Sequence, residues 1–228
     1  MHWAALRLLL AIAYPLLAHA ASATRSGALA GLALADIAMI VLLGPLLARR
    51  AWAWALLAAL CTGLVALAQS RHALLPLLAP PVVFTGLVAW WFARTLRAGQ
   101  VPLISRIVAA LDQVPPEQLP PDLARYTRSL TIAWAMLLAV IAVTNLVLAL
   151  LAVPDGLLAQ LGVTPPISLS THRWSLFANL IDYGLIGGFF VAEYLYRKRR
   201  FPGRYHNALD FIRRMRGLGP VFWRQLFH

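Results

Sequence analysis

The sequence predicts an all-α polytopic membrane protein with about six transmembrane helices and short interfacial amphipathic helices on the cytoplasmic side. Hydrophobic residues make up 61% of the 228 residues and charged residues only 12%, whereas soluble domains are about 45–50% apolar and about 25% charged. Several stretches reach the roughly 20 apolar residues that a spanning helix needs. Because lipid offers the backbone no hydrogen-bond partner, these Ala- and Leu-rich stretches are expected to be helical. The composition therefore excludes a soluble globular protein.

The predicted spans fall into two groups, separated by a more polar connection. We place them at 3–22, 27–48, 51–70, 73–93, 129–153 and 174–196. The chain then divides into a four-helix segment, an amphipathic connection, a two-helix segment and a basic amphipathic tail. Their ranges are 1–93, 94–128, 129–196 and 197–228.

The first span has two interpretations. Residues 1–22 place Arg7 before an apolar run and end in Ala18-His19-Ala20, which also fits the pattern of a secretory signal peptide. We interpret the segment as a retained helix, and cleavage stays open as the alternative. Either choice leaves the orientation of the other helices unchanged.

Basic residues set the predicted orientation, because Lys and Arg accumulate on the cytoplasmic side of membrane proteins. The formal net charge is +12, and six spans place all of the 20 Lys and Arg residues on one side except Arg25, Arg71 and Arg173. We therefore expect a bacterial inner-membrane protein with both termini in the cytoplasm. The expected partners are anionic phospholipid headgroups or an acidic protein, and not nucleic acid, because the basic residues lie beside apolar runs.

Two segments have the apolar spacing of helices that lie on a membrane surface. In the connection, Ile104, Ile107, Val108 and Leu111 recur at helical intervals after Pro102, which suits a first helical turn. The tail carries a similar stripe with basic residues opposite it. The residues that we predict to dock lipid or a partner are Arg197, Lys198, Arg199, Arg200, Arg213, Arg214 and Arg216.

Polar residues inside the predicted spans form the candidate site, since an ionisable group at bilayer depth costs about 2.5–3.5 kcal/mol. The candidates are Asp36, Asn145, Asn179 and Asp182. At about 100° per residue, Ser175, Asn179, Asp182 and Glu193 share one face of the last span. Two interpretations stay open: a polar pocket or relay between helices, and a packing contact in which protonated carboxyls bond to Asn or to backbone carbonyls. We expect Glu193 to reach the headgroups near Arg197.

The prolines of the fourth span are a further sign of irregular structure. Pro76, Pro80 and Pro81 each remove an amide donor, so a kink or a broken helix is expected there. Transporters use such breaks to line substrate sites, although prolines also merely bend spanning helices.

The remaining motifs favour no metal, cofactor or catalytic centre. The single Cys61 excludes an internal disulfide and a Cys-built metal site. His19, His72 and His172 fall in separate segments and are interpreted as exposed interfacial residues. No catalytic motif is found, so the catalytic residues are unknown and the chain is interpreted as non-enzymatic.

The second half of the chain resembles a known family. The residues that carry the resemblance are Pro102-Leu103-Ile104-Ser105-Arg106, Leu123-Ala124-Arg125-Tyr126-Thr127-Arg128-Ser129-Leu130-Thr131, Trp134, Trp174-Ser175-Leu176-Phe177-Ala178-Asn179, Tyr183, Glu193-Tyr194-Leu195-Tyr196-Arg197 and Phe201-Pro202. Together they resemble small inner-membrane proteins associated with bacterial aryl-polyene and xanthomonadin-type pigment biosynthesis.

The resemblance implies a setting, not a reaction. Aryl polyenes are conjugated acyl chains built on acyl carrier proteins and attached to lipid. The expected role is an accessory or scaffold subunit that docks an acidic acyl carrier protein or polyene synthesis enzymes. One alternative is a transporter or flippase component, indicated by the prolines and intramembrane acids. Another is a membrane enzyme that transfers a lipid-linked acyl chain, with Asp36 or Asp182 as its acid or base.

Overall fold

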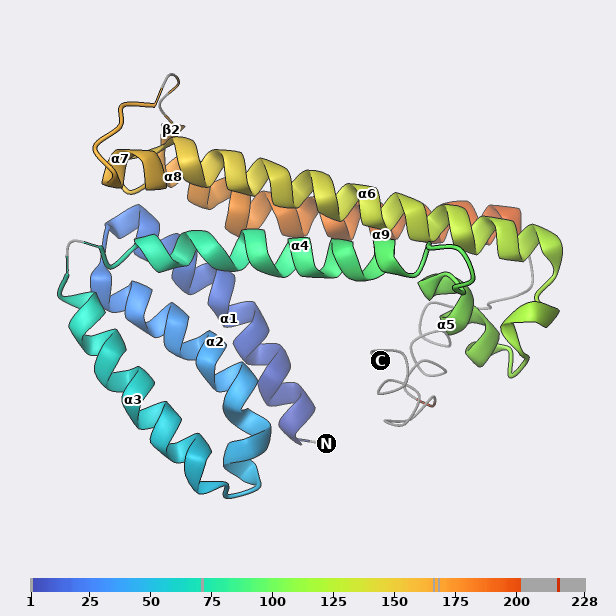
Figure 1. The fold of residues 1–228 in the computed structure, drawn as a ribbon, viewed down its shortest axis with the longest axis horizontal. Coiled ribbons are helices and arrows are strands. Elements are labelled where there is room, and N and C mark those ends of the chain that lie inside the picture. The colour runs from blue at the N-terminus through green and yellow to red at the C-terminus, as the bar shows by residue number, and fades with distance from the viewer. Residues whose placement is uncertain (1, 71, 166, 168, 202–216, 218–228) are drawn as a thin grey trace. The chain divides into compact units, whose positions relative to one another are not determined.

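The computed structural model describes residues 2–70, 72–165, 167, 169–201 and 217, and it is mostly helical (Figure 1). The long helices are α1 (His2–Thr24), α2 (Gly27–Leu47), α3 (Ala51–Ala68), α4 (Ala79–Arg94), α6 (Pro121–Leu151) and α9 (Asp182–Arg200). The shorter helices are η1 (Leu75–Leu78), α5 (Leu103–Leu111), η2 (Pro116–Gln118), α7 (Leu157–Gln160), α8 (Thr171–Leu176) and η3 (Phe177–Ile181). Two short strands, β1 (Ala152–Val153) and β2 (Leu169–Ser170), pair in parallel.

Within the described residues, five helical segments are long and apolar enough to cross a membrane. They are Ala5–Thr24, Gly27–Leu47, Ala51–Ala68, Leu75–Arg94 and Pro121–Leu151. These correspond to the first five predicted spans, so the helical, membrane-compatible architecture is confirmed. Residues 171–200 are also helical but are not among the five, and the sixth span therefore stays a prediction.

The chain forms two compact units, and each is described by itself. Unit 1 contains Met1–Val83 and Ala142–Leu185, and unit 2 contains Phe84–Ile141 and the described residues from Ile186 onward.

The core of unit 1 combines α1, α2, η1 and α8. Tyr14, Ala18 and Ala21 of α1 pack in one cluster with Leu77 and Trp174. Small alanines allow α1 and α2 to approach closely, as is usual for helices packed in a membrane. The first predicted span, which has two interpretations, thus supplies part of this core, and its retention in the mature protein stays a prediction.

The core of unit 2 is aromatic. Trp134 is buried on α6, and its ring contacts those of Phe189, Phe190 and Phe92, with ring centroids 4.7, 6.0 and 6.3 Å away. Such rings bury large areas and prefer tilted or edge-to-face contacts, as the 85° angle between Trp134 and Phe189 shows. This cluster joins α6 to α4 and α9 within the unit.

The prolines of the fourth span lie at helix starts and not at a mid-helix kink. Pro76 occupies the first turn of η1, and Pro80 and Pro81 lie in the first turn of α4. Proline suits such positions because the first amides of a helix have no intrahelical acceptor. The irregularity is therefore the change from the tight turn of η1 to the α-helical geometry of α4.

A helix occurs where the connection was predicted to form one, with Pro102 immediately before its first residue. Part of its apolar stripe is buried within the protein, because Val108 packs against Leu119 and Leu123. Its placement on a membrane surface stays a prediction.

Cysteine labelling tests the orientation. In a chain with Cys61 replaced by alanine, exposed positions Ala98 and Thr164 lie in connections that the predicted spans place on opposite sides of the membrane. We expect a membrane-impermeant maleimide to label T164C in cells with only the outer membrane permeabilised, and A98C only after the inner membrane is opened. The reverse pattern would contradict the predicted orientation.

Candidate functional site

The structure brings two of the predicted site residues into direct contact. Asn145 of α6 donates a hydrogen bond from its Nδ2 to Oδ2 of Asp182, the first residue of α9. Asn145 is fully buried and Asp182 is 3% exposed. The contact lies within unit 1. A carboxyl and an amide are therefore paired in an otherwise apolar interior.

Unsatisfied polar atoms gather in the same unit. Among the described residues, the buried side-chain atoms without a hydrogen-bond partner are Tyr14 Oη, Asp36 Oδ2, Asn145 Oδ1, Trp174 Nε1 and Asp182 Oδ1. All of them belong to unit 1. Since buried polar groups are nearly always hydrogen-bonded, this concentration places the candidate polar site in unit 1.

The other two predicted pocket residues are placed differently. Asp36 is buried on α2 with Oδ2 unpartnered, and no described hydrogen bond joins it to Asn145 or Asp182. Asn179 lies in the π-helical turn η3, and its side chain is outside the described residues. The predicted four-residue pocket is thus observed only as the Asn145–Asp182 pair.

The π turn η3 interrupts the predicted polar stripe on the last span, because it changes the helical phase between Ser175 and Asp182. A π turn bonds residue i to i+5 instead of i+4 and adds one residue to the turn. The 100° spacing that aligned Ser175 with Asp182 and Glu193 therefore fails across Phe177–Ile181. Ser175 instead contacts His19, with 3.1 Å between Oγ and Nδ1, while Asp182 contacts Asn145. π turns are rare in proteins, and those that occur are often found at functional sites.

The histidine prediction is also wrong for two of its three residues. His19 and His72 are half-buried rather than exposed, and the Nδ1 atom of His72 lies 2.8 Å from Oε1 of Gln160. The side chain of His172 is outside the described residues. No group of three or more His, Cys, Asp or Glu residues that could hold a metal occurs in the part of the chain that the structure describes.

Unit 2 contains a second polar cluster, of which the sequence interpretation identified only the nearness of Glu193 to Arg197 and missed Tyr126. Tyr126 of α6 donates a hydrogen bond of 2.8 Å to Oε1 of Glu193, and Nε of Arg197 lies 3.2 Å from the same oxygen. The side chains of Arg197 and Glu193 are only 12% and 8% exposed. Glu193 thus lies beside Arg197, as expected, and is held by Tyr126 as well, while its position at the level of the headgroups stays a prediction. The i,i+4 spacing of the two charges was the available signal.

Aromatic rings enclose this cluster. The Tyr126 ring stacks on Tyr196 at 5.9 Å and meets Phe201 edge-on at 5.2 Å. A small pocket opens beside Tyr126, Glu193 and Arg197, and Ile104 is among the apolar side chains that line it. The cluster thus joins the end of α9 to the beginning of α6.

Side-chain hydroxyls hold the neighbouring helix in place. The amides of Leu103 and Ile104, at the start of α5, donate to Oγ1 of Thr95 at 3.0 Å and of Thr131 at 3.3 Å. Ser105 Oγ and Thr127 Oγ1 are 2.6 Å apart. These bonds satisfy first-turn amides that have no intrahelical acceptor. They fix α5 to α4 and α6 at one end of unit 2.

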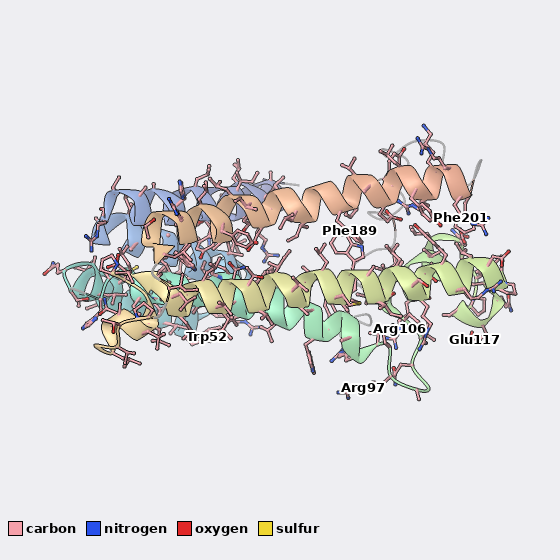
Figure 2. All side chains as sticks on the ribbon, turned by 90° about the horizontal axis from the view of Figure 1, so that it is seen from above. Trp52, Arg97, Arg106, Glu117, Phe189 and Phe201 are labelled. Carbon is pink, nitrogen blue, oxygen red and sulfur yellow. The ribbon has the colours of Figure 1, made fainter. Side chains whose placement is uncertain are left out.

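We call this part of the molecule the basic end of unit 2. Its basic residues are Arg94, Arg97, Arg106, Arg125, Arg128, Arg197, Lys198, Arg199 and Arg200. Figure 2 shows Arg97, Arg106, Glu117 and Phe201 together at this end. Acidic residues are fewer there: Asp112, Glu117, Asp122 and Glu193.

The predicted docking residues are only partly described. Lys198, Arg199 and Arg200 are exposed, whereas Arg197 is engaged with Glu193. Arg213, Arg214 and Arg216 lie outside the described residues, as does the predicted apolar stripe of the tail. The basic end gains Arg97, Arg125 and Arg128, exposed side chains that the docking prediction did not include.

The fold defines a helical protein in which several helices could span a membrane. Comparisons of the chain with protein-family models, with curated proteins and with solved structures found no match.

The Tyr126 hydroxyl provides a direct test of the unit 2 cluster. We expect Tyr126→Phe to destabilise the protein by about 1.5 kcal/mol, because a net hydrogen bond to a charged group contributes about that amount. The measurement is denaturant unfolding in micelles, followed by tryptophan fluorescence. The matched control is Tyr196→Phe, because the ring of Tyr196 stacks on Tyr126 but is exposed. Equal stability losses in the two variants would argue against the Tyr126–Glu193 bond.

Proposed function

We propose that the protein is a non-catalytic inner-membrane accessory subunit of aryl-polyene lipid assembly, and that its basic end docks an acidic cytoplasmic partner. The pigment setting rests on the resemblance of the second half of the chain. The observation that carries the docking role is the exposed surplus of basic side chains at the basic end of unit 2. An acyl carrier protein, or an enzyme of polyene synthesis, has the acidic chemistry that would complement it.

Charge and rigidity support this proposal. Each basic group near an anionic membrane leaflet contributes about 1 kcal/mol of attraction, and the attraction between exposed charges decays over a Debye length of about 8 Å at physiological salt. The hydroxyl bonds at the start of α5 and the Tyr126–Glu193–Arg197 cluster hold the supporting helix ends in fixed geometry. A preformed basic surface loses less entropy on binding than a loose one. Anionic headgroups would use the same charges to anchor the protein.

Substitution of the exposed arginines tests the docking role. We expect R97Q/R125Q/R128Q to insert normally, to lose salt-sensitive co-purification of the acidic partner, and to lower pigment in cells severalfold. The Arg125 pair with Asp122 is exposed, so its loss should cost little stability. The measurements are membrane abundance, pull-down at low and high salt, and extracted pigment.

The matched control is R49Q/R50Q, which removes exposed basic residues from the α2–α3 connection in unit 1. It should leave both pigment and pull-down unchanged. Equal losses in the two variants would indicate a general effect of positive charge, and unchanged pull-down in the first variant would contradict docking at the basic end.

A transporter or flippase component is the second candidate, and the buried polar atoms of unit 1 favour it. Deletion of the gene separates the two. Lost pigment supports a role in assembly, whereas pigment retained in the inner membrane supports export.

A further inference from the structure

The Asn145–Asp182 pair has one oxygen on each partner that is left without a bond. The amide of Asn145 donates from Nδ2 to Oδ2 of Asp182, while Oδ1 of each residue is buried and accepts nothing from the described residues. Both unsatisfied atoms are acceptors. A single additional donor between the two groups would therefore satisfy both side chains.

A proton on Asp182 provides that donor without any further group. A carboxylic acid and a primary amide can pair through two hydrogen bonds, one from the amide N–H to the acid carbonyl and one from the acid O–H to the amide carbonyl. The first of these bonds is the observed one. Protonation of Oδ1 of Asp182 supplies the second and removes both unsatisfied acceptors.

The surroundings favour the neutral acid. Among the described residues, Asp182 takes part in no salt bridge, and a buried carboxylate without a cation is costly. The titratable groups nearby are tyrosines: Tyr183 follows Asp182 on α9, and Tyr14 of α1 lies within electrostatic range of Tyr183. Asp36, on α2, offers no positive charge either, and no described hydrogen bond joins it to the pair. His19 is engaged with Ser175, before the π turn.

We infer that Asp182 and Asn145 form a buried proton site, in which Asp182 binds a proton from water and donates it to Oδ1 of Asn145. Binding forms one O–H bond on the carboxylate, and release returns the proton to water, with no change in oxidation state. The π turn at Phe177–Ile181 ends immediately before Asp182 and sets its orientation toward α6. This site is independent of the docking function proposed above.

Infrared spectroscopy of the purified full-length protein in micelles tests the inference. At neutral pH we expect a protonated-carboxyl C=O band that shifts in D2O and disappears in Asp182→Asn. An amide at position 182 can still pair with Asn145, so this variant should fold. The exchange variant N145D/D182N keeps one acid and one amide and should retain the band. Asp36→Asn identifies any contribution from Asp36, which is buried and, unlike Asp155 and Glu193, takes part in no described salt bridge.

Each outcome decides the matter. Loss of the band in D182N together with its retention in the exchange variant supports the proton site. A band unchanged in D182N, a band that is insensitive to D2O, or no band in the wild-type protein overturns it. If D182N does not fold, the D36N protein is labelled with 13C at the aspartate carboxyl carbon and its infrared spectrum is recorded at neutral pH. A protonated-carboxyl band that moves with the label supports the proton site, and the absence of such a band overturns it.

Discussion

Replacing Gly27 with alanine is expected to prevent unit 1 from assembling. Gly27 is the first residue of α2, and a Cβ atom at this position would overlap the carbonyl oxygen of Ala68, at the end of α3. The contact is with backbone, so no side-chain rotation relieves it. Overpacking of this kind costs about 3 kcal/mol or more. The measurement is the fraction of expressed protein that is recovered as a monodisperse species in mild detergent.

Gly31 is the matched control, since it follows about one turn later on the same helix. A Cβ there would meet Ala68 Cβ and Leu64 O at 3.6 Å, an ordinary van der Waals distance. Gly31→Ala should therefore be recovered as well as the wild-type protein. Normal recovery of Gly27→Ala would show that α2 and α3 do not approach as closely as described.

Truncation of Trp134 is expected to have the second large effect. Trp134→Ala removes the centre of the aromatic cluster of unit 2 and should destabilise the protein by about 3–5 kcal/mol, the usual cost of losing a buried tryptophan. Denaturant unfolding in micelles measures the loss. Trp52, labelled in Figure 2, is half-exposed on α3 and is not a member of any described core cluster. Trp52→Ala should change stability little, and comparable losses would contradict a central role for Trp134.

Helices were predictable because spanning segments carry a strong local signal. The apolar run from Gly27 to Leu47 sets α2 almost to the residue, since Ser26 caps its start through the amide of Leu29. The first residue of a helix is harder to locate where the helix begins with polar residues. Helix α6 begins at Pro121, well before the predicted residue 129, because Asp122 and Arg125 belong to the helix but lie outside the apolar run. Hydropathy detects where lipid begins and not where a helix does.

The sequence predicted which residues belong to the candidate site but not which of them are in contact. Asp182 and Asn145 stood out because polar residues are rare within apolar runs, and they do pair. Their pairing could not be derived, because it depends on how two helices separated in sequence rotate about their axes. The Tyr126–Glu193 bond was missed for the same reason: the two residues are 67 positions apart and neither is unusual alone.

The π turn sets the direction of the side chains that follow it on the last helix. A turn with one extra residue shifts every following side chain by about 100° relative to an uninterrupted α-helix. If Phe177–Ile181 became α-helical at unchanged length, Asp182 would turn away from Asn145 although every polar side chain was still present, whereas removal of one residue from this segment would restore α-helical geometry and keep Asp182 directed toward Asn145. A one-residue deletion within Phe177–Ile181 is therefore expected to preserve the Asn145–Asp182 contact, whereas a one-residue deletion or insertion within α9, between Asp182 and Glu193, would turn the two acids about 100° relative to each other. The contact between Asp182 and Asn145 therefore depends on the backbone geometry of the five preceding residues and not only on the two side chains that form it.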